Sequence, residues 1–445
     1  MFMNPVATEI KTTSRRRFLQ RTTASSIGAL ALGMSAHPQT PSKTLPAAFS
    51  ALKPLGTKIR PITIAEFGER LQHAQRIMSG GQSATGQAPE LSRYDALFLA
   101  PGSSLYYFTG IRWGLSERLL GLVIPRTGKP IIVVPGFEEG RLREKLQLPF
   151  EVRAWQENES PTQLAASALA DRGIRTGRIG IEETVGFTFS DHLRQAAPTF
   201  DYVSADPVTI ACRARKSAHE LELMRLACDA TFDVFRAVFA SLQEGMSQDD
   251  IANFVEGGFA KMGLQGGALV LLGASAALPH GTVKPQTLKE GDVVLIDGGC
   301  KVEGYESDVT RTAVFGKPSA KITRTFEIVR KSQDAALDAA RAGRLSGTVD
   351  DAARGVVTSA GYGPDYKFFT HRLGHGIGLD GHEHPYLVRG SKTTLEPGMT
   401  FSNEPGIYIP GEFGMRCEDD MVIAADGPAQ LLTQGFAVSL EMPFG

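Results

Sequence analysis

"VVLIDGGCKVEGYESDVTRTAVF" (residues 293–315) contains two aspartates, Asp297 and Asp308, each next to an apolar run. The first run ends at Asp297, a glycine-containing segment follows, and Asp308 lies on the returning run. This pattern predicts a β-hairpin. An aspartate that closes a buried strand is costly unless another group compensates its charge. Taken singly, each residue also fits a structural interpretation, with Asp297 capping a turn and Asp308 on the surface.

A second stretch, "GMTFSNEPGIYIPGEFGMRCEDDMVI" (residues 398–423), repeats this design with glutamates. Glu404 ends one apolar strand and Glu418 lies on the return. Because side chains alternate along a strand, Arg416 and Glu418 should share one face while Cys417 points the other way. Arg416 can therefore orient a carboxylate, and Cys417 cannot be a ligand beside it.

The segment "HRLGHGIGLDGHEHP" (residues 371–385) lies between these two stretches and is rich in histidine and glycine. Histidine is uncommon and titrates near neutral pH, so a concentration of it suggests ligands or proton carriers. A solvated loop is the alternative. The segment holds four of the chain's nine histidines, namely His371, His375, His382 and His384.

If the two hairpins face each other, four carboxylates and a histidine meet in the middle of a domain. Like charges held together at low dielectric repel strongly and would have to take up protons. Two divalent cations remove this conflict. The oxygen-rich, thiolate-free set favours Mn²⁺, Co²⁺ or Fe²⁺ over a structural Zn²⁺. Such a pair of ions typically shares a water whose lowered pKa makes it a nucleophile near neutral pH.

Apolar runs alternating with helix-like segments before residue 210 predict an α/β domain. After it, a helix with apolar positions from Leu221 to Phe239 begins a second domain. This domain contains a loose internal repeat. Each half has a long helix, a shorter helix, a histidine and then strands with two acidic residues. We expect the shorter helices to be capped at Ser247 and Thr348. We expect residues 1–50 to be a signal peptide and linker, and the two domains to span residues 54–210 and 215–445.

Bulk composition and the N-terminus limit the partners and the location. A formal net charge of −1 over 445 residues gives no support to nucleic-acid binding. The four cysteines lack CxxC spacing, which argues against a thiolate zinc site and a disulfide scaffold. "SRRRFLQ" (residues 14–20) precedes a short apolar run (residues 27–34) and resembles a twin-arginine export signal. That run is too short to span a bilayer, so we expect export without a stable membrane anchor.

Three segments around these acidic and histidine residues resemble the motifs of a known family. "IDGGCKVEGYESDVTRT", "GHGIGLDGHE" and "NEPGIYIPGEFGMRCEDD" resemble the M24 metallopeptidase family, and more closely its Xaa-Pro aminopeptidase and prolidase branch. "SLYYFTGIRWGLSERLLGLVIP" is similar to the creatinase-type N-terminal domain of those enzymes. The resemblance implies a creatinase-like α/β domain followed by a pseudo-twofold α+β catalytic domain of the pitta-bread fold. It also implies two divalent ions, Mn²⁺ with Co²⁺, Fe²⁺ or Zn²⁺ as alternatives, and a homodimer or higher homo-oligomer.

The resemblance assigns metal ligands residue by residue. Asp297 would chelate one ion, Asp308 and Glu418 would bridge both, and His375 and Glu404 would complete the other. Glu404 also matches the family's proton shuttle, which takes a proton from the attacking water and passes it to the leaving nitrogen.

The resemblance also assigns residues that contact substrate. His280 and His382 match two non-ligand histidines that hold the scissile carbonyl and stabilise the tetrahedral intermediate. His371 matches a histidine near the proline pocket, with Tyr408 and Arg416 supporting it. His384 has no such counterpart.

The sequence therefore predicts a metallo-exopeptidase that cleaves the bond before proline, as an aminopeptidase or a strict dipeptidase. The choice depends on whether a cation such as Arg372 or Arg389 holds the proline carboxylate; the glycine-rich segment inclines us toward a third residue being tolerated. Two alternatives remain at this stage: a hydrolase of organophosphate-type esters on the same scaffold, and an inert binding protein. The intact ligand set argues against the latter.

Overall fold

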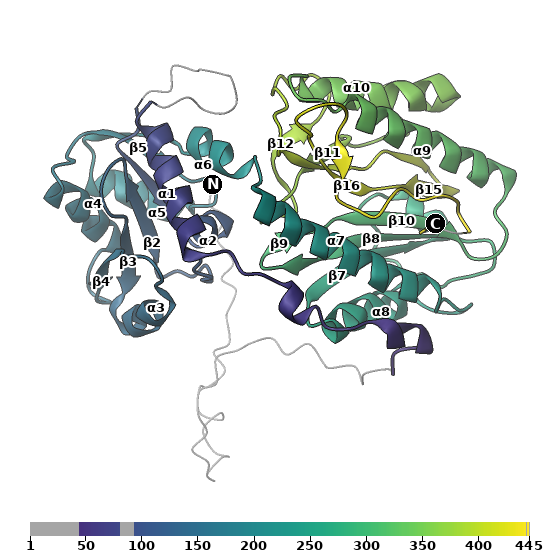
Figure 1. Ribbon diagram of the computed structural model, residues 1–445, viewed down its shortest axis with the longest axis horizontal. Coiled ribbons are helices and arrows are strands. Elements are labelled where there is room, and N and C mark those ends of the chain that lie inside the picture. The colour runs from purple at the N-terminus through teal and green to yellow at the C-terminus, as the bar shows by residue number, and fades with distance from the viewer. Residues whose placement is uncertain (1–43, 81–92, 442, 445) are drawn as a thin grey trace, which may run out of the picture. The chain divides into compact units, whose positions relative to one another are not determined.

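The computed structural model describes residues 44–80, 93–441 and 443–444 (Figure 1). The predicted export signal at residues 14–34 lies outside these ranges. Residues 45–445 form one compact unit. Within the described residues, no helix is both long enough and apolar enough to cross a membrane. The predicted domain boundaries near residues 54, 210 and 215 remain predictions.

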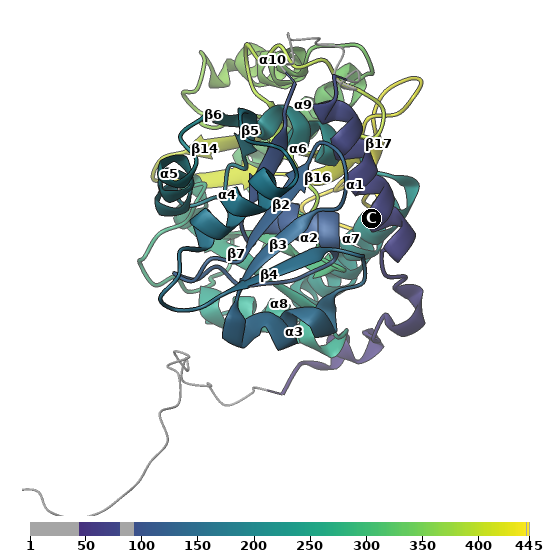
Figure 2. The ribbon, with the colours of Figure 1, turned by 90° about the vertical axis from the view of Figure 1, so that its left-hand side faces the viewer.

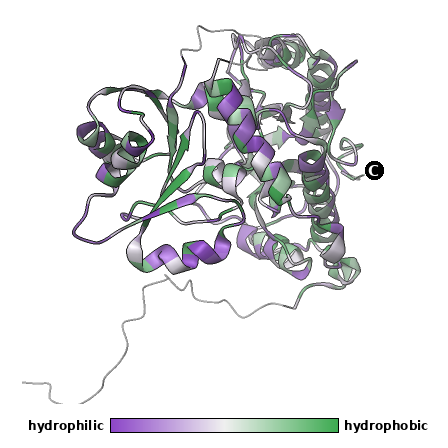
Figure 3. Ribbon diagram, turned by 60° about the vertical axis from the view of Figure 1, so that its left-hand side comes forward, coloured by the Kyte–Doolittle hydropathy of each residue, from purple (hydrophilic) through white to green (hydrophobic). Residues whose placement is uncertain are grey.

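The N-terminal part is built on a six-stranded mixed sheet in the order β4-β3-β2-β1-β5-β6, seen face-on in Figure 2. β1 pairs antiparallel with β2 and parallel with β5, so the sheet is of the α/β type that the alternation predicts. Figure 3 shows hydrophobic strands in this sheet, and β1, β2 and β3 are fully buried, as strands covered on both faces must be. The strands are β1 (Ala96–Leu99), β2 (Gly121–Pro125), β3 (Ile131–Pro135), β4 (Glu151–Trp155), β5 (Gly177–Ile181) and β6 (Phe200–Ser204). The helices are α1 (Ile64–Met78), α2 (Ser103–Thr109), α3 (Glu139–Lys145), α4 (Pro161–Asp171), α5 (Phe187–Ala196) and α6 (Asp206–Arg213).

The C-terminal part has two helix pairs with strands between them (Figure 1). One sheet has the order β10-β8-β7 with β9 beside β8, and another has the order β12-β11-β13-β16-β17. Each helix pair precedes its own strands along the chain, which is the predicted repeat. The helices are α7 (Ala218–Phe239), α8 (Gln248–Lys261), α9 (Ala320–Ala339) and α10 (Ser346–Val357). The strands are β7 (Gln265–Leu272), β8 (Val293–Val302), β9 (Tyr305–Glu306), β10 (Val309–Val314), β11 (Gly374–Gly376), β12 (Glu383–Leu387), β13 (Thr400–Asn403), β14 (Gly406–Ile409), β15 (Phe413–Arg416), β16 (Asp419–Val422) and β17 (Gln430–Leu431).

Short helical turns complete the described chain. Within the segment predicted to be signal and linker, Phe49 is fully buried and packs against Phe254 of α8. The turns are the 3₁₀ segments η1 (Ala47–Ala51), η2 (Gly56–Lys58), η3 (Gly136–Glu138) and η4 (Gly273–Ala277), and the π segment η5 (Thr358–Tyr362).

The first predicted hairpin forms, but its strand does not stop at Asp297. β8 continues to Val302, and Asp297 pairs with Thr310 next to the end of the β8–β10 ladder. Asp308, predicted on the returning strand, lies just before β10. The reversal is made instead by Glu303 and Gly304, both at positive φ, a turn geometry that glycine tolerates at no steric cost.

The prediction that the strands of the second hairpin are directly connected is wrong. Glu404 does follow strand β13, but the chain then makes a separate hairpin of β14 and β15 before β16 returns to pair with β13. Glu418 lies just before β16 and forms an isolated bridge with Thr310 of the first hairpin. This bridge is what joins the two acidic strand pairs.

Helix caps follow the prediction in the first repeat and not in the second. Ser247 and Asp250 form the expected capping box of α8. The expected cap at Thr348 and Asp351 is wrong, because α10 begins at Ser346 after Leu345, with no side-chain cap. The N–H groups of Ser346 and Gly347 instead donate to the carbonyls of Thr393 and Ser391, so backbone satisfies the helix end.

Candidate metal centre

A cavity of about 540 Å³ opens between the two acidic strand pairs. All five predicted metal ligands line it, together with both predicted carbonyl-binding histidines. Tyr408 is not among the lining residues, although it contacts two of them, His371 and Arg416. The lining consists of Leu269, Pro279, His280, Asp297, Asp308, His371, Arg372, His375, His382, Glu404, Arg416 and Glu418.

Three overlapping groups of side chains bring potential ligand atoms within 4.8 Å of one another. Asp308, Glu418 and His375 each belong to two of the groups. Asp308 and Glu418 are the two residues expected to bridge the ions. The groups are Asp297, Asp308 and Glu418; His375, Glu404 and Glu418; and Asp308, His375 and His382.

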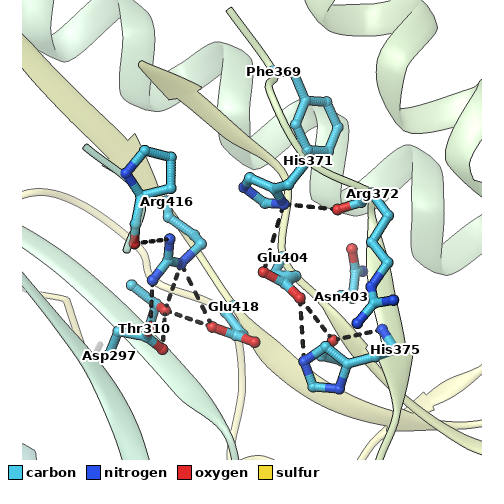
Figure 4. Close-up of polar contacts among 12 residues, drawn as sticks. Asp297, Thr310, Phe369, His371, Arg372, His375, Asn403, Glu404, Arg416 and Glu418 are labelled. Atoms are coloured by element: carbon cyan, nitrogen blue, oxygen red, sulfur yellow. Dashed lines mark hydrogen bonds and ion pairs between the residues drawn. The ribbon is translucent and has the colours of Figure 1, made fainter. Parts of the chain in front are cut away.

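Thr310 and Arg416 hold the carboxylates on one side of the cavity (Figure 4). The Thr310 hydroxyl lies 2.8 Å from Asp297 Oδ1 and 2.5 Å from Glu418 Oε2. Arg416 donates from Nη2 to Asp297, and its Nε lies 3.7 Å from Glu418 Oε2. As predicted, Arg416 and Glu418 share a face, while the buried Cys417 is a free thiol outside the cavity lining.

His375 faces the other side of the cavity with one defined nitrogen. Its Nδ1 lies 3.1 Å from the Gly376 carbonyl, which can only accept, so Nδ1 carries the proton. Nε2 is then directed at Glu404 (3.3 Å) and Asp308 (3.7 Å). A ring nitrogen oriented by a backbone carbonyl on its far side is typical of a metal-binding histidine.

The buried carboxylates need positive charge. Burial and the nearby Asp297 raise the pKa of Asp308 well above its usual value, and burial with the charge of Asp308 does the same for Glu418. Burial is the largest effect on Glu404 and would raise its pKa, but the hydrogen bond with His375 and the charges of His371, His375 and Arg416 together lower the pKa of Glu404. Four carboxylates and one imidazole therefore form a donor set that fits two divalent cations.

A hydrogen-bond chain links His371, Tyr408 and Arg416 at the wall of the cavity. His371 Nδ1 lies 2.7 Å from the Arg372 carbonyl, so its Nε2 accepts from the Tyr408 hydroxyl at 2.8 Å. Arg416 Nη1 donates to the same hydroxyl at 3.0 Å. Burial lowers the pKa of His371, which agrees with a neutral ring in this chain.

The remaining histidines occupy different places. His382 is exposed at the cavity, stacks on His375 with ring centroids 3.7 Å apart, and lies 3.2 Å from an Arg372 nitrogen. His280 is exposed on the segment after η4 and lines the same cavity. His384, which had no assigned role, points away from this lining, with Nε2 3.9 Å from Glu183.

Family comparisons agree with this geometry. Residues 222–425 match the description "Metallopeptidase family M24", and residues 87–215 match "Creatinase/Prolidase N-terminal domain". A putative dipeptidase of Bacillus subtilis, YkvY, is 34% identical over 345 residues, which cover 77% of this chain and 94% of that protein. The chain belongs to metallopeptidase family M24.

Other relatives of this M24 enzyme carry more specific names. A Pyrococcus horikoshii protein named Xaa-Pro dipeptidase is 31% identical over 76% of this chain and 92% of its own length. Among solved structures, dipeptidase PepE from Mycobacterium ulcerans has a TM-score of 0.76 at 33% identity, covering 86% of this chain and 99% of that one. Prolidase from Thermococcus sibiricus has a TM-score of 0.73 at 30% identity, covering 83% and 97%. The creatinase-like and pitta-bread architecture is thereby confirmed.

Three residues that support the M24 site were not predicted from the sequence. Thr310 follows Asp308 by two positions, and Ser402, which donates to Glu404 Oε1 at 3.2 Å, precedes Glu404 by two. Strand alternation places such neighbours on the ligand's face and could have found both. Asp420 accepts the backbone N–H of Asp308 at 3.0 Å, a contact between separate strands with no local signal.

The glycines on either side of His375 lie close to neighbouring backbone. A Cβ on Gly374 would lie 2.1 Å from the Ser402 carbonyl, and one on Gly376 would lie 2.5 Å from the Glu383 carbonyl. In the M24 enzyme, these glycines let β11 pack tightly between neighbouring strands.

The arrangement is that of a dinuclear metal-dependent hydrolase. Divalent ions held by the five ligands would lower the pKa of a water molecule and polarise a carbonyl. The protein supplies an oriented carboxylate at Glu404 and exposed imidazoles at His280 and His382. Together these groups suit hydrolysis of a peptide bond by the M24 peptidase.

Proposed function

We propose that this protein is an Xaa-Pro dipeptidase that removes the N-terminal residue before a C-terminal proline. The observation that carries this proposal is the convergence of five metal ligands and the His371–Tyr408–Arg416 chain in one cavity. Relatives named Xaa-Pro dipeptidase and prolidase, aligned over most of their length, support the substrate class.

The cavity's cations favour a dipeptide over a longer chain. Arg416 is occupied by Asp297, whereas among the described residues no carboxylate pairs with Arg372, which lines the cavity. Arg389, the other cation considered from the sequence, is outside the lining and pairs with Asp365 at 2.7 Å. We assign Arg372 to the proline carboxylate, which revises the expectation that a third residue is tolerated.

In the proposed reaction, Glu404 accepts the proton of the attacking water and delivers it to the proline nitrogen. His280 and His382 donate hydrogen bonds to the scissile carbonyl oxygen as charge develops on it. His371, held neutral and oriented by Tyr408, forms part of the wall against the proline ring. A shaped wall suits this leaving group, because the proline nitrogen is part of the ring and the Xaa-Pro amide has no N–H to recognise.

The test compares release of alanine from Ala-Pro, Ala-Pro-Ala and Ala-Ala-Ala by metal-loaded enzyme. We expect rapid cleavage of Ala-Pro and little of the other two. Comparable rates on Ala-Ala-Ala would overturn proline specificity, and equal rates on Ala-Pro-Ala would make the enzyme an aminopeptidase. Paraoxon hydrolysis without peptide cleavage would favour the ester-hydrolase alternative instead.

We also propose Mn²⁺ as the physiological ion, with Co²⁺ as a functional substitute, because hard oxygen donors outnumber the single imidazole. Elemental analysis of protein isolated from the native host, with activity after reconstitution by Mn²⁺, Co²⁺, Fe²⁺ or Zn²⁺, distinguishes these ions. Zinc in the isolated protein together with full zinc activity would contradict the assignment.

We further propose export by the twin-arginine route to the periplasm or cell exterior. The support is the sequence alone: arginines at 15 and 16, then Phe-Leu and a short apolar run. Replacing Arg15 and Arg16 with lysine should leave folded enzyme in the cytoplasm. Undiminished export of that variant would reject this route.

A homodimer or higher homo-oligomer is proposed as well. Leu115 and Phe137 are large apolar side chains left 63% and 66% exposed, which suits an interface. Sedimentation velocity at micromolar concentration should show a mass of at least twice 47.8 kDa, and a monomer would refute the proposal.

A further inference from the structure

The short loop that carries His382 is held at both ends by acidic side chains. Asp380 stands before it and Glu383 after it, with only Gly381 and His382 between them. Glu383 is 7% exposed and begins β12, whereas His382 is exposed. Because successive residues of an extended chain point to opposite sides, a fixed Glu383 sets the direction of His382.

Glu383 is held by two buried cations, Arg213 at the end of α6 and Lys216 in the connection to α7. Lys216 Nζ lies 2.5 Å from Glu383 Oε1, and Arg213 Nη2 lies 2.6 Å from Oε2. The cationic side chains are only 2% and 9% exposed. Burial alone would raise the pKa of Glu383, but the two cations reverse that effect and lower it.

Arg213 also reaches the other end of the loop. The same Nη2 atom lies 2.6 Å from Asp380 Oδ2, and Nη1 donates to the Ser104 hydroxyl at 3.0 Å. Ser103 donates to the second oxygen of Asp380. One guanidinium therefore joins the residue before the loop, the residue after it, and the start of α2.

The connection itself is fixed to the C-terminal part. The Lys216 N–H donates to the Gly398 carbonyl at 2.8 Å, and Arg215 forms a backbone bridge with Met399. Gly378 leaves no spare room beneath this contact, since a Cβ there would lie 2.7 Å from both Glu383 Oε1 and Lys216 Cε. The ion pair thus joins two segments that are each held by backbone hydrogen bonds.

The imidazole of His382 has little other support. It stacks on His375 and contacts Arg372, which is itself partly exposed. A hydrogen-bond donor for a developing charge must be placed within about 0.5 Å, and a displacement of about 1 Å can cost on the order of 10² in rate. The direction of His382 therefore depends on how firmly its backbone is held.

We propose that Arg213 and Lys216 are positioning residues for hydrolysis, which fix Glu383 and Asp380 and thereby aim His382 at the scissile carbonyl. This inference rests on the proposed role of His382 as a carbonyl-binding donor. It gives the α6–α7 connection a part in turnover, beyond covalently linking the two parts of the chain.

The main variant is the charge-balanced pair Lys216→Met with Glu383→Gln, which leaves no isolated buried charge. We expect kcat on Ala-Pro to fall about 10- to 100-fold, the scale of a misplaced donor, with KM within about twofold. Metal content should be unchanged. A fall in metal content that accounts for the lost activity would overturn the proposal.

The decisive readout is coupling to His382. In a His382→Ala background, the same pair of substitutions should change kcat by less than about twofold, because residues that act through one group are non-additive. A purely structural role would give the same loss in both backgrounds, and that result would overturn the proposal.

Asp380→Asn is a milder second variant, because that side chain is 42% exposed and Arg213 keeps Glu383 as partner. It should lower kcat several-fold in the wild-type background and leave kcat unchanged in the His382→Ala background. An unchanged kcat in the wild-type background would contradict the positioning role. This variant decides the question if the double variant does not fold. Arg215→Met, on the same connection but paired with Glu396 at the surface, is the matched control and should keep wild-type kcat.

Failure of the proposed function is recognised separately. If the wild type does not cleave Ala-Pro, or if His382→Ala alone keeps wild-type kcat, the role of His382 is wrong. If both behave as proposed and the anchor variants lose activity equally in both backgrounds, only the positioning inference is wrong.

Discussion

Thr310 shows how much of this site is decided by one small side chain. Its hydroxyl lies between two ligands from different strand pairs, Asp297 and Glu418, and it accepts a hydrogen bond from Arg416 Nε at 3.0 Å. A hydroxyl has a single proton, so it can donate to only one of these carboxylates at a time. It therefore helps to hold the two carboxylates at a fixed separation while leaving their charge for cations.

Replacing Thr310 with valine keeps the shape and removes that hydroxyl. We expect metal affinity to fall about 10- to 100-fold, the usual effect of losing a partner that orients a ligand. Isothermal titration with Mn²⁺ measures the change directly. Thr325→Val, a buried threonine of α9 bonded to the Lys321 carbonyl, is the matched control and should leave affinity unchanged. Wild-type affinity in Thr310→Val would contradict this role.

Among the elements, β11 is the one most constrained by its neighbours. Only three residues long, it carries His375 between β12 and β13. Its pairing with β12 is irregular, since His375 opposes Tyr386 while Gly376 opposes Glu383. Such a bulge redirects side chains, and here it lies at His375, whose ring stacks on that of His382.

Gly374→Ala should disturb this packing, because the new Cβ would lie 2.1 Å from a backbone oxygen of β13 that cannot easily move. Overpacking of this kind costs about 1–3 kcal/mol, and the shift of His375 should also weaken metal binding. Chemical denaturation and metal titration measure the two effects.

Gly355→Ala in α10 is the matched control for that substitution, because nothing lies within 4 Å of its added Cβ. It should stabilise the protein by about 0.5–1 kcal/mol, the usual gain of alanine over glycine within a helix. Equal stability changes at both glycines would show that close packing of β11 is not the cause.

At the scale of the whole molecule, the cluster of carboxylates opposes folding unless cations neutralise it. Burial raises the pKa values of Asp308 and Glu418, and repulsion from neighbouring carboxylates raises them further. Such groups bind protons more tightly folded than unfolded, so the metal-free protein loses stability as pH rises above their unfolded pKa values. Bound cations relieve the same repulsion and stabilise only the folded site.

Chelation with EDTA should therefore abolish hydrolysis and lower the melting temperature together, and Mn²⁺ should restore both. The increase in melting temperature caused by Mn²⁺ should be largest at neutral pH and shrink as pH falls, because protons compete for the raised-pKa carboxylates. Calorimetry from pH 5 to 8 checks the sign. Full activity in a preparation shown to be metal-free, or a metal effect that grows on acidification, would contradict the dinuclear site.

What the sequence determined is local chemistry and periodicity. Asp297, Asp308, Glu404 and Glu418 could be selected because carboxylates beside apolar strands need compensation, and His375 because it lies in the histidine-rich segment between them. The helix pattern and the capping box at Ser247 depend on residues a few positions apart, and the structure confirms both. The family resemblance added the role assigned to each ligand.

Only the tertiary structure decided how distant segments meet. Three features depend on chain pairings that have no local signal in the sequence. Glu418 bridges to Thr310, β16 pairs with β13 after an intervening hairpin, and backbone near residue 391 caps α10. The same holds for Lys216 and Arg213 at Glu383, separated by 167 and 170 residues. Such contacts form because a buried charge must find a partner in space, and the sequence alone does not say which segment brings it.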